Sequence, residues 1–358
     1  MTSPKPSSTA PLAPGKLPPA LLGRLLSSYL ATDSSVIVGP GVGRDAAVIE
    51  LDDRILVATT DPITFATRHA ADHLVDVNAN DLACLGATPR WLLATALFRE
   101  GIGAAEIEAE FAALARASAR RGVALVGGHS EIVAGLDRTI LVGMMIGETT
   151  RARLVKPGGA RPGDRLLLTK GLAIEGTALL ARELGDCLTS ALGPEVVQKS
   201  ASLLIDPGIS VVADALAMNE IGGVTALHDP TEGGLAMAAR EIGVAAGCGI
   251  RIDREAAPIL AETRAIAAAL GLDPIGMLAS GSLLVAASPE ATPRLVAASR
   301  AAGVPATEIG EVVPAENGFI LTEPGGERPL PHFETDEVSR ALIEASRACA
   351  PLDVGRTG

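Results

Sequence analysis

Two aspartates flank a pair of strand-like runs near the start of the chain, and both are candidate metal ligands. The runs 46–51 and 55–59 are rich in Val, Ile and Leu, and the two aspartates between them favour a tight turn. Pairing about that turn brings Asp45 close to Thr60, since opposed residues have Cβ atoms roughly 4.5–5.5 Å apart. Asp45 and Asp61 are therefore predicted to share one divalent cation. The alternative is that both residues only end strands, because Asp is common in turns.

A further candidate ligand lies on a predicted helix. Apolar residues recur with helical spacing over residues 75–85, and Gly86 can end the helix. Asn78 falls on the apolar stripe and Asp81 lies beside it, so both side chains point toward the interior. An unsatisfied buried polar group costs about 1–3 kcal/mol, which a bound ion or nucleotide would offset. The alternative is that both side chains are structural and hydrogen-bond to neighbouring backbone.

The segment His228–Gly234 leads into a predicted helix over residues 235–246. Asp229 is predicted to be the N-cap of this helix, with Pro230 at its first position. Capping does not explain the paired Gly233-Gly234, since each glycine costs roughly 0.5–1 kcal/mol relative to alanine within a helix. The pair allows either tight packing or the approach of an anion to the free N–H groups of the helix.

Two glycines, Gly127 and Gly128, interrupt a run of Val and Leu, which predicts a bulge or close approach to a ligand. His129 follows them and is a candidate base, ligand or hydrogen-bond donor. The glycines within residues 39–43 are a weak phosphate-loop pattern, because a strand follows them where a dinucleotide fingerprint requires a helix. The chain also lacks a G-x-x-x-x-G-K-[ST] motif, so ATP binding would not use a Walker loop.

Composition limits the class of protein. The chain has 358 residues, 48% of them apolar, which suggests two soluble domains. A net charge of −12 and an aromatic content of 2% argue against nucleic-acid binding. An acidic protein still binds ATP when magnesium bridges the two.

The N-terminal segment, the lengths of the apolar runs and the cysteines indicate the cellular location. Residues 1–19 are rich in Pro and Ser, which predicts a disordered tail rather than a signal peptide. No apolar run is long enough to cross a bilayer, so no membrane contact is expected. Four cysteines lie far apart without a C-x-x-C pair, which is typical of reduced thiols in a cytoplasmic protein.

Strand-like and helix-like patterns alternate along the chain, which predicts an α/β or α+β fold. A Gly- and Pro-rich stretch at 156–164 breaks the pattern and marks a domain boundary. We expect domains over residues 20–150 and 156–322, followed by an extension over 323–358. The runs 123–133 and 138–146 are expected to pair as a hairpin. Further helices are expected near 21–30, 104–120, 175–184, 207–218 and 258–270, and further strands near 165–169, 249–252 and 282–286.

The motifs G-x-G-x-D-A-A-V-I, T-T-D, N-D-L-A-x-x-G-A-x-P, G-G-H-S-E and H-D-P-T-E-G-G-L, taken in order, resemble the aminoimidazole ribonucleotide (AIR) synthase or PurM-like superfamily. Its members include hydrogenase maturation factor HypE, thiamine-monophosphate kinase and selenophosphate synthetase, and the motif wording is most similar to HypE. The resemblance spans about residues 21–313. It implies an N-terminal mixed-sheet domain that forms a homodimer, a C-terminal α/β domain, and ATP with Mg²⁺ bound between subunits.

Carried over position by position, the resemblance implies that Asp45, Asp61 and Asp81 bind magnesium. His129 is the candidate catalytic residue. The candidates for ATP or phosphate contacts are Arg44, Asn80, Gly127, Gly128, Asp229, Gly233 and Gly234. The family chemistry is ATP-driven activation of an oxygen by phosphoryl transfer, in which positioning and charge neutralisation by the metal do most of the work.

The sequence departs from HypE at several motifs. Arg44 stands where paired acids are usual, which removes one magnesium ligand and supplies a cation to phosphate. The G-G-D-T-K of HypE is replaced by G-G-H-S-E, with His129 for the acid and Glu131 for the lysine, and Ser280 stands where an acid is expected. HypE carries the carbamoyl group on a terminal cysteine, whereas this sequence ends at Gly358 without one, so cyanide formation in that way is not expected.

The leading hypothesis is an ATP- and Mg²⁺-dependent enzyme that activates an oxygen of a small-molecule or protein-bound substrate. A small-molecule kinase similar to thiamine-monophosphate kinase is one alternative. A nucleotide-binding regulatory or maturation subunit without catalysis is the other, and the departures at Arg44, His129, Glu131 and Ser280 motivate it.

Overall fold

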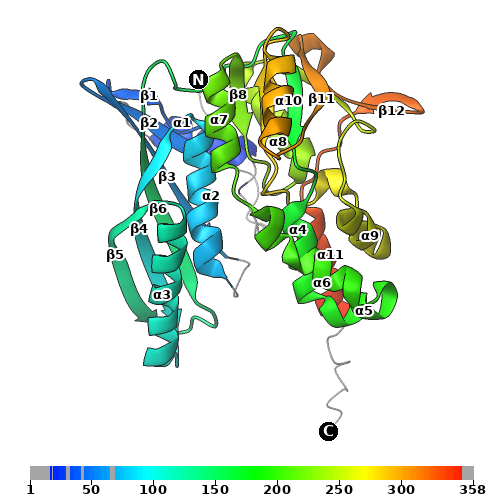
Figure 1. The fold of residues 1–358 in the computed structure, drawn as a ribbon. Coiled ribbons are helices and arrows are strands. Elements are labelled where there is room, and N and C mark those ends of the chain that lie inside the picture. Colours follow the sequence, from blue (N-terminus) through cyan, green and yellow to red (C-terminus); the bar gives the residue numbers. More distant parts are fainter. Residues whose placement is uncertain (1–16, 18, 30–32, 42–43, 65–68, 349–358) are drawn as a thin grey trace, which may run out of the picture.

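The computed structural model describes residues 17, 19–29, 33–41, 44–64 and 69–348, and the predicted N-terminal tail lies almost wholly outside these residues. The described part contains two mixed sheets with helices packed against them (Figure 1). The first half consists of α1 (Pro19–Tyr29), β1 (Val36–Val38), β2 (Ala46–Leu51), β3 (Arg54–Ile63), α2 (Ala70–Cys84), β4 (Thr88–Arg99), α3 (Ala104–Arg120), β5 (Ala124–Val133) and β6 (Ile140–Thr149).

The second half forms a seven-stranded sheet in the order β13-β12-β9-β11-β7-β10-β8. Its elements are β7 (Arg165–Thr169), α4 (Ile174–Glu183), α5 (Gly185–Leu192), α6 (Pro194–Ser202), η1 (Leu204–Gly208), α7 (Val212–Ile221), β8 (Val224–His228), α8 (Gly234–Ala246), β9 (Gly249–Asp253), α9 (Ala261–Leu270), η2 (Pro274–Gly276), β10 (Leu284–Ala287), α10 (Thr292–Ala301), β11 (Ala306–Val313), η3 (Ala315–Asn317), β12 (Phe319–Glu323), β13 (Gly326–Pro329) and α11 (Glu337–Ala348). The two-domain α/β fold predicted from the sequence is confirmed.

The first hairpin has the predicted register. β2 and β3 are antiparallel, and Ala46 faces Thr59. Asp52 has a φ of 53° in the turn, a left-handed conformation that Asp tolerates better than most residues. The chain therefore holds Asp45 and Asp61 at the same end of the hairpin.

The predicted hairpin between residues 123–133 and 138–146 is wrong. β5 runs parallel to β4 at the edge of the first sheet, and β6 lies between β3 and β4. The reason is that α3 returns the chain to the start of β4, which gives the crossover connection that a parallel pair needs. Since β5 takes the outer place, the chain returns across the sheet before β6 begins.

One face of the first sheet is covered by α2 and α3, and no described element covers the other face (Figure 1). On the covered side, Leu74, Leu82 and Met145 are fully buried. Each such side chain contributes roughly 1.5–3 kcal/mol through burial. On β5, by contrast, Val126 is 54% exposed and Ile132 is 57% exposed.

The helix expected near residues 207–218 begins only at Val212. Asp206 has φ −138° and ψ 113°, which are not helical angles. Proline disfavours the helical conformation of the residue before it, so Pro207 interrupts the helix there. This break creates the turn that carries Ile209 and Val211.

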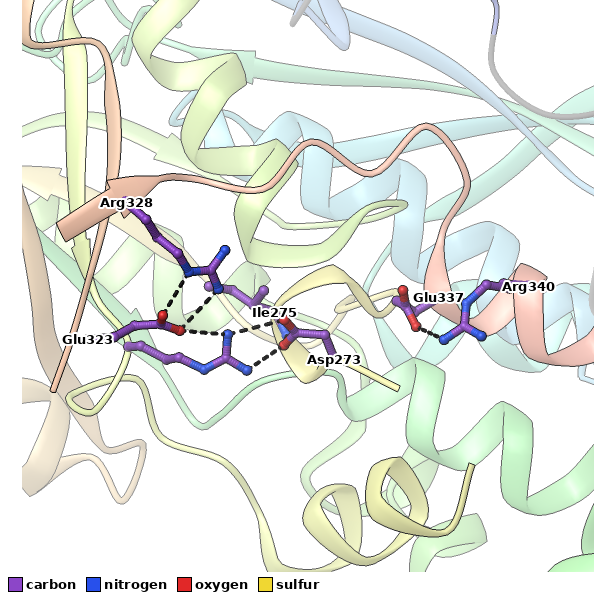
Figure 2. Close-up of polar contacts among 7 residues, drawn as sticks. Asp273, Ile275, Glu323, Arg328, Glu337 and Arg340 are labelled. Atoms are coloured by element: carbon purple, nitrogen blue, oxygen red, sulfur yellow. Dashed lines mark hydrogen bonds and ion pairs between the residues drawn. The ribbon is translucent and has the colours of Figure 1, made fainter. Parts of the chain in front are cut away.

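The second sheet continues through β13 to Pro329, so the first residues of the predicted extension belong to it. Arg328 bonds Glu323 across the β12–β13 turn with Nε 2.7 Å from Oε2 (Figure 2). Arg254 bonds Asp273 at 2.7 Å. Asp273 also accepts the backbone N–H of Ile275 at 3.2 Å and so caps η2. These contacts fix the end of the sheet, after which the chain leads to α11.

Among the described helices, no single one is long and apolar enough to span a membrane. The bent pair Pro194–Gly208 and Val212–Ile221 meets that test only when its two parts are joined.

Candidate functional site

A cavity of about 120 Å³ lies between the two halves of the chain and is lined by residues from both. Four of its lining residues are aspartates: Asp45, Asp61, Asp81 and Asp229. A smaller cavity of about 20 Å³ shares three of them, Asp45, Asp81 and Asp229. The three aspartates of the first half thus meet an aspartate that follows β8 in the second.

Thr59 of β3 connects the two elements that carry the first-half carboxylates. Its Oγ1 lies 2.7 Å from the Asp45 carbonyl oxygen and 2.7 Å from Asp81 Oδ2. A hydroxyl has one proton to donate, so it cannot donate to both oxygens. A protonated Asp81 carboxyl resolves this by donating to Thr59, which then donates to the Asp45 carbonyl.

The charge environment favours that protonated form. Burial raises the pKa of Asp81 well above its usual range, and the neighbouring carboxylates Asp229, Asp61 and Asp45 raise it further. Burial likewise raises the pKa of Asp229 to about 7, although the adjacent His228 opposes this rise. The four carboxylates outnumber the one positive charge of His228, and a divalent cation is a ligand that would balance the remainder.

His228, at the end of β8, places a positive charge beside the carboxylates. Burial lowers the pKa of His228, but the 2.8 Å bond between its Nε2 and Glu241 outweighs burial and raises the pKa to about 9. Its other nitrogen, Nδ1, and Asp229 Oδ2 are both buried without a hydrogen-bond partner among the described residues. An unpartnered donor and an unpartnered acceptor thus line one cavity, which fits a ligand that carries both phosphate oxygens and a metal cation.

The same cavity is lined by a second ionisable pair. Nδ1 of His73 on α2 lies 2.9 Å from Glu175 Oε1 on α4, and both side chains are buried. Ser280 is 1% exposed, and its Oγ has no partner among the described residues. From the sequence, Ser280 is visible only as a substitution, and neither His73 nor Glu175 is predicted. The signal that could have identified His73 is its four-residue spacing from Val77 and Asp81, which places all three on one face of a helix.

The structure brings together the three predicted metal ligands with Asp229. Asp61 hydrogen-bonds Asp81, which helps to raise the pKa of Asp81. Within the described ranges, no group of three or more His, Cys, Asp or Glu side chains already has metal-binding geometry. The oxygen-rich donor set nevertheless fits magnesium, which prefers carboxylate and phosphate oxygens and retains several waters.

Two predicted phosphate contacts lie away from both cavities. Asn80 is fully buried and uses its amide within the protein: Nδ2 donates to the Ile209 carbonyl at 2.9 Å, and Oδ1 accepts the Val211 N–H at 2.8 Å. Arg44 is exposed and donates to the Gly39 carbonyl at 3.4 Å. The structure gives Asn80 the role of joining α2 to the turn before α7. Val42 and Gly43 of the glycine-rich segment lie outside the described residues.

The β5 candidates also lie outside the cavities. The pairing of β5 with β4 shifts between Leu92 and Leu93, so the predicted bulge is present. A Cβ on Gly128 would lie 1.8 Å from the Ala94 carbonyl oxygen, which explains this glycine by close approach of two strands. Gly127, beside it, borders neither cavity. The His129 side chain is 64% exposed and lies 3.6 Å from Glu131.

The capping prediction for Asp229 is wrong, because α8 begins at Gly234 with Gly233 as its N-cap. Both glycines have positive φ, 77° and 61°, which keeps the residues before them in a turn. The carboxylate of Asp229 is therefore available to the cavity.

The paired glycines are explained by packing. A Cβ on Gly234 would lie 2.6 Å from the Met277 carbonyl oxygen. The N–H of Gly233 donates to Asp336 Oδ2 at 2.7 Å, and that of Gly234 donates to the Thr231 carbonyl. Since both N–H groups are already bonded, the geometry does not favour phosphate binding by Gly233 and Gly234.

The described cysteines form no disulfide with one another, as expected for reduced thiols. Cys84, Cys187 and Cys248 are free, and Cys349 lies outside the described residues. The Cys84 Sγ lies 3.7 Å from Asp229 Oδ1 and lines the smaller cavity. Burial and the nearby aspartates raise the pKa of this thiol well above its usual range, so it remains a thiol.

Two family models match the chain. The model for the N-terminal domain of AIR synthase related proteins matches residues 43–149, and the model for the C-terminal domain matches residues 161–322. The carbamoyl dehydratase HypE of Rhodobacter capsulatus is 32% identical over 307 residues, which cover 83% of this chain and 87% of the relative. The HypE of Cupriavidus necator is 30% identical over 297 residues, which cover 80% and 82%.

Solved structures agree on the fold. HypE in complex with ATP superposes with a TM-score of 0.67 at 24% identity, covering 88% of this chain and 95% of that one. A HypE–HypF complex gives a TM-score of 0.68 at 21% identity, covering 81% and 94%. AaThiL complexed with AMPPCP and TMP gives 0.66 at 21% identity, covering 84% and 91%.

Proposed function

Because the chain belongs to the AIR synthase related family, we propose that it is an ATP- and Mg²⁺-dependent enzyme of the HypE type. It activates an oxygen of a small-molecule or protein-bound substrate by phosphoryl transfer. The observation that carries this proposal is the meeting of Asp45, Asp61, Asp81 and Asp229 around one cavity between the two halves.

In this proposal, Asp45, Asp61 and Asp81 hold magnesium and Asp229 contributes from the second half. Bound magnesium supplies positive charge to the phosphates during transfer. The imidazolium of His228 offers its unpartnered Nδ1–H to a phosphate oxygen, which costs no rearrangement because the bond to Glu241 already holds the ring.

The HypE relatives are described as carbamoyl dehydratases, and one HypE structure contains HypF. We therefore propose a group carried by a partner protein as the first substrate class to test. Ser280, which stands where the resemblance implies an acid, leaves an uncharged hydroxyl in the lining of the cavity. This hydroxyl suits a polar, uncharged substrate group better than a cationic one.

We also propose a homodimer formed by the first sheet. Its uncovered face and edge expose several large apolar side chains, namely Leu125, Val126, Ile132 and Met144. Adjacent exposed apolar residues of this kind mark interaction surfaces. Pairing of two chains along the β5 edge and the adjoining uncovered face would cover them.

The test is magnesium-dependent ATP binding by calorimetry, followed by ADP release with and without candidate substrates. Asp45→Ala and Asp81→Ala are expected to weaken binding in the presence of magnesium, whereas the matched control Asp53→Ala, exposed at the hairpin turn, keeps it. Added thiamine monophosphate examines the kinase alternative directly, since its phosphorylation would establish that reaction. Tight binding without turnover would support the non-catalytic alternative, and absence of binding would refute the proposal.

A further inference from the structure

One stripe of α2 lines the main cavity. His73, Val77 and Asp81 follow one another at four-residue spacing, and all three border it. Eight residues of helix separate the Cα atoms of His73 and Asp81 by about 12 Å along the axis. The helix therefore holds His73 and Asp81 well apart along the same cavity.

The His73 ring is held by Glu175. The contact between Nδ1 and Oε1 is 2.9 Å, and the two side chains are 7% and 10% exposed. Among the described residues, Nε2 of His73 makes no hydrogen bond. An imidazole held by a carboxylate through one nitrogen, with its other nitrogen unbonded and the residue lining a cavity, suits a general base.

Resting on the proposed function, we propose that His73 is the general base for the acceptor oxygen and that Glu175 is its positioning residue. The acceptor oxygen forms a bond to the γ-phosphorus of ATP. The bond from that phosphorus to the bridging oxygen breaks, and ADP leaves with the electron pair. The acceptor proton passes to Nε2 of His73, so the products are a phosphorylated acceptor, ADP and an imidazolium.

The charges around His73 determine the pH range in which it acts. Burial lowers the pKa of His73, but the bond to Glu175 and the nearby Asp76 outweigh burial and keep the pKa above its usual range, against the opposing charge of Arg182 on α4. Arg121 of α3 bonds Asp76, and Asp61 of β3 borders the same cavity. Because a base acts in its neutral form, the rate rises with pH through the pKa of His73. Loss of the Glu175 charge moves this rise to lower pH.

The experiment uses magnesium and ATP with water as the acceptor. His73→Gln is expected to lower ATP hydrolysis by roughly 10²- to 10⁴-fold, the usual size of general-base catalysis, while ATP affinity stays within about twofold. Glu175→Gln causes a smaller loss and shifts the ascending limb of the pH profile to lower pH. The matched control His332→Gln, an exposed histidine outside both cavities, changes neither quantity.

A second measurement is independent of turnover. The chain has five histidines, so their imidazole signals can be resolved by NMR in the nucleotide-free protein. The His73 signal is the one that disappears in His73→Gln, and its pH titration gives the pKa of His73. Its pKa falls in Glu175→Gln if the pair forms in solution. The inference alone is overturned if His73→Gln hydrolyses ATP at the wild-type rate, or if Glu175→Gln leaves the His73 titration unchanged. Failure of the wild-type protein to bind or hydrolyse ATP overturns the proposed function together with the inference.

Discussion

At the scale of single residues, the burial of Asp81 among carboxylates opposes folding, which fits its proposed role in metal binding. Its side chain is buried among three other carboxylates, and its pKa is raised, so ionising it at neutral pH opposes folding. Asn has nearly the same shape and can still bond Thr59 without the charge. Asp81→Asn is therefore expected to raise the free energy of unfolding at pH 7, without magnesium, by roughly 0.5–2 kcal/mol. Urea denaturation measures this change.

The same substitution should weaken ATP binding in magnesium by at least the roughly 10- to 100-fold that outer-shell changes cost at metal sites. Asp53→Asn, at an exposed position of the same hairpin, is the control for both measurements. An Asp81→Asn protein that is less stable than wild type would contradict the crowding argument. One that binds ATP normally would remove Asp81 from the site.

Residue types and short spacings predicted which aspartates meet at the cavity, but they did not predict which histidines line it. Asp45 and Asp61 follow from one hairpin, whose register depends only on neighbouring residues. The proposed role of His73 depends on its contact with Glu175, which lies 102 positions away in the chain, and no local pattern predicts that contact. His129 follows a conspicuous glycine pair, yet those glycines serve a strand bulge and place the side chain on an exposed edge.

At the scale of elements, the turn before α8 is closed by the segment that begins α11. Asp336 accepts the N–H of Gly233 through Oδ2 at 2.7 Å and the N–H of Val338 through Oδ1 at 2.7 Å. Burial raises the pKa of Asp336 to about 6 from 3.8, even though these N–H groups lower it. The folded state therefore binds the Asp336 proton more tightly than the unfolded state does.

The sign of the pH effect follows from this shift. The stability contribution of Asp336 is complete below about pH 4 and is lost as pH rises through about 6. Because the folded and unfolded pKa values differ by about two units, the free energy of unfolding changes by roughly 3 kcal/mol. In Asp336→Asn this part of the pH dependence should disappear. Urea denaturation from pH 4 to pH 7.5 should then show the difference in unfolding free energy between the two proteins changing by about 3 kcal/mol. Parallel curves for wild type and variant would refute this assignment, and Asp53→Asn again supplies the control.

Local patterns predicted elements better than their partners. The helix expected at residues 104–120 and the strand expected at 165–169 have the predicted bounds, since each depends on its own periodicity. The pairing of β5 with β4 was missed because α3 carries the chain across the sheet between them. Asp229 was taken for a cap because the left-handed angles of the two following glycines are not visible in a capping pattern.

At the scale of the whole molecule, the first sheet presents an apolar face that no described element covers. In β4 and β6, residues facing α2 and α3 are buried, while alternate residues on the other face are only partly buried. β5 adds Val126 and Ile132, each more than half exposed, at the sheet edge. An edge strand with exposed apolar residues readily pairs with another chain.

We predict that a lysine at this surface separates two chains that otherwise associate. The wild-type protein should have the mass of two chains in sedimentation analysis, and Ile132→Lys or Val126→Lys should have the mass of one, because a lysine ammonium buried in an apolar interface loses its hydration. Ile205→Lys is the matched control, since Ile205 is 79% exposed in the second half of the chain and away from this sheet. A monomeric wild-type protein, or a dimer that survives both lysine variants while the Ile205 control behaves as wild type, would rule out this face as the interface. If ATP affinity falls together with the dimer in Ile132→Lys but not in the control, the cavity also depends on the second chain.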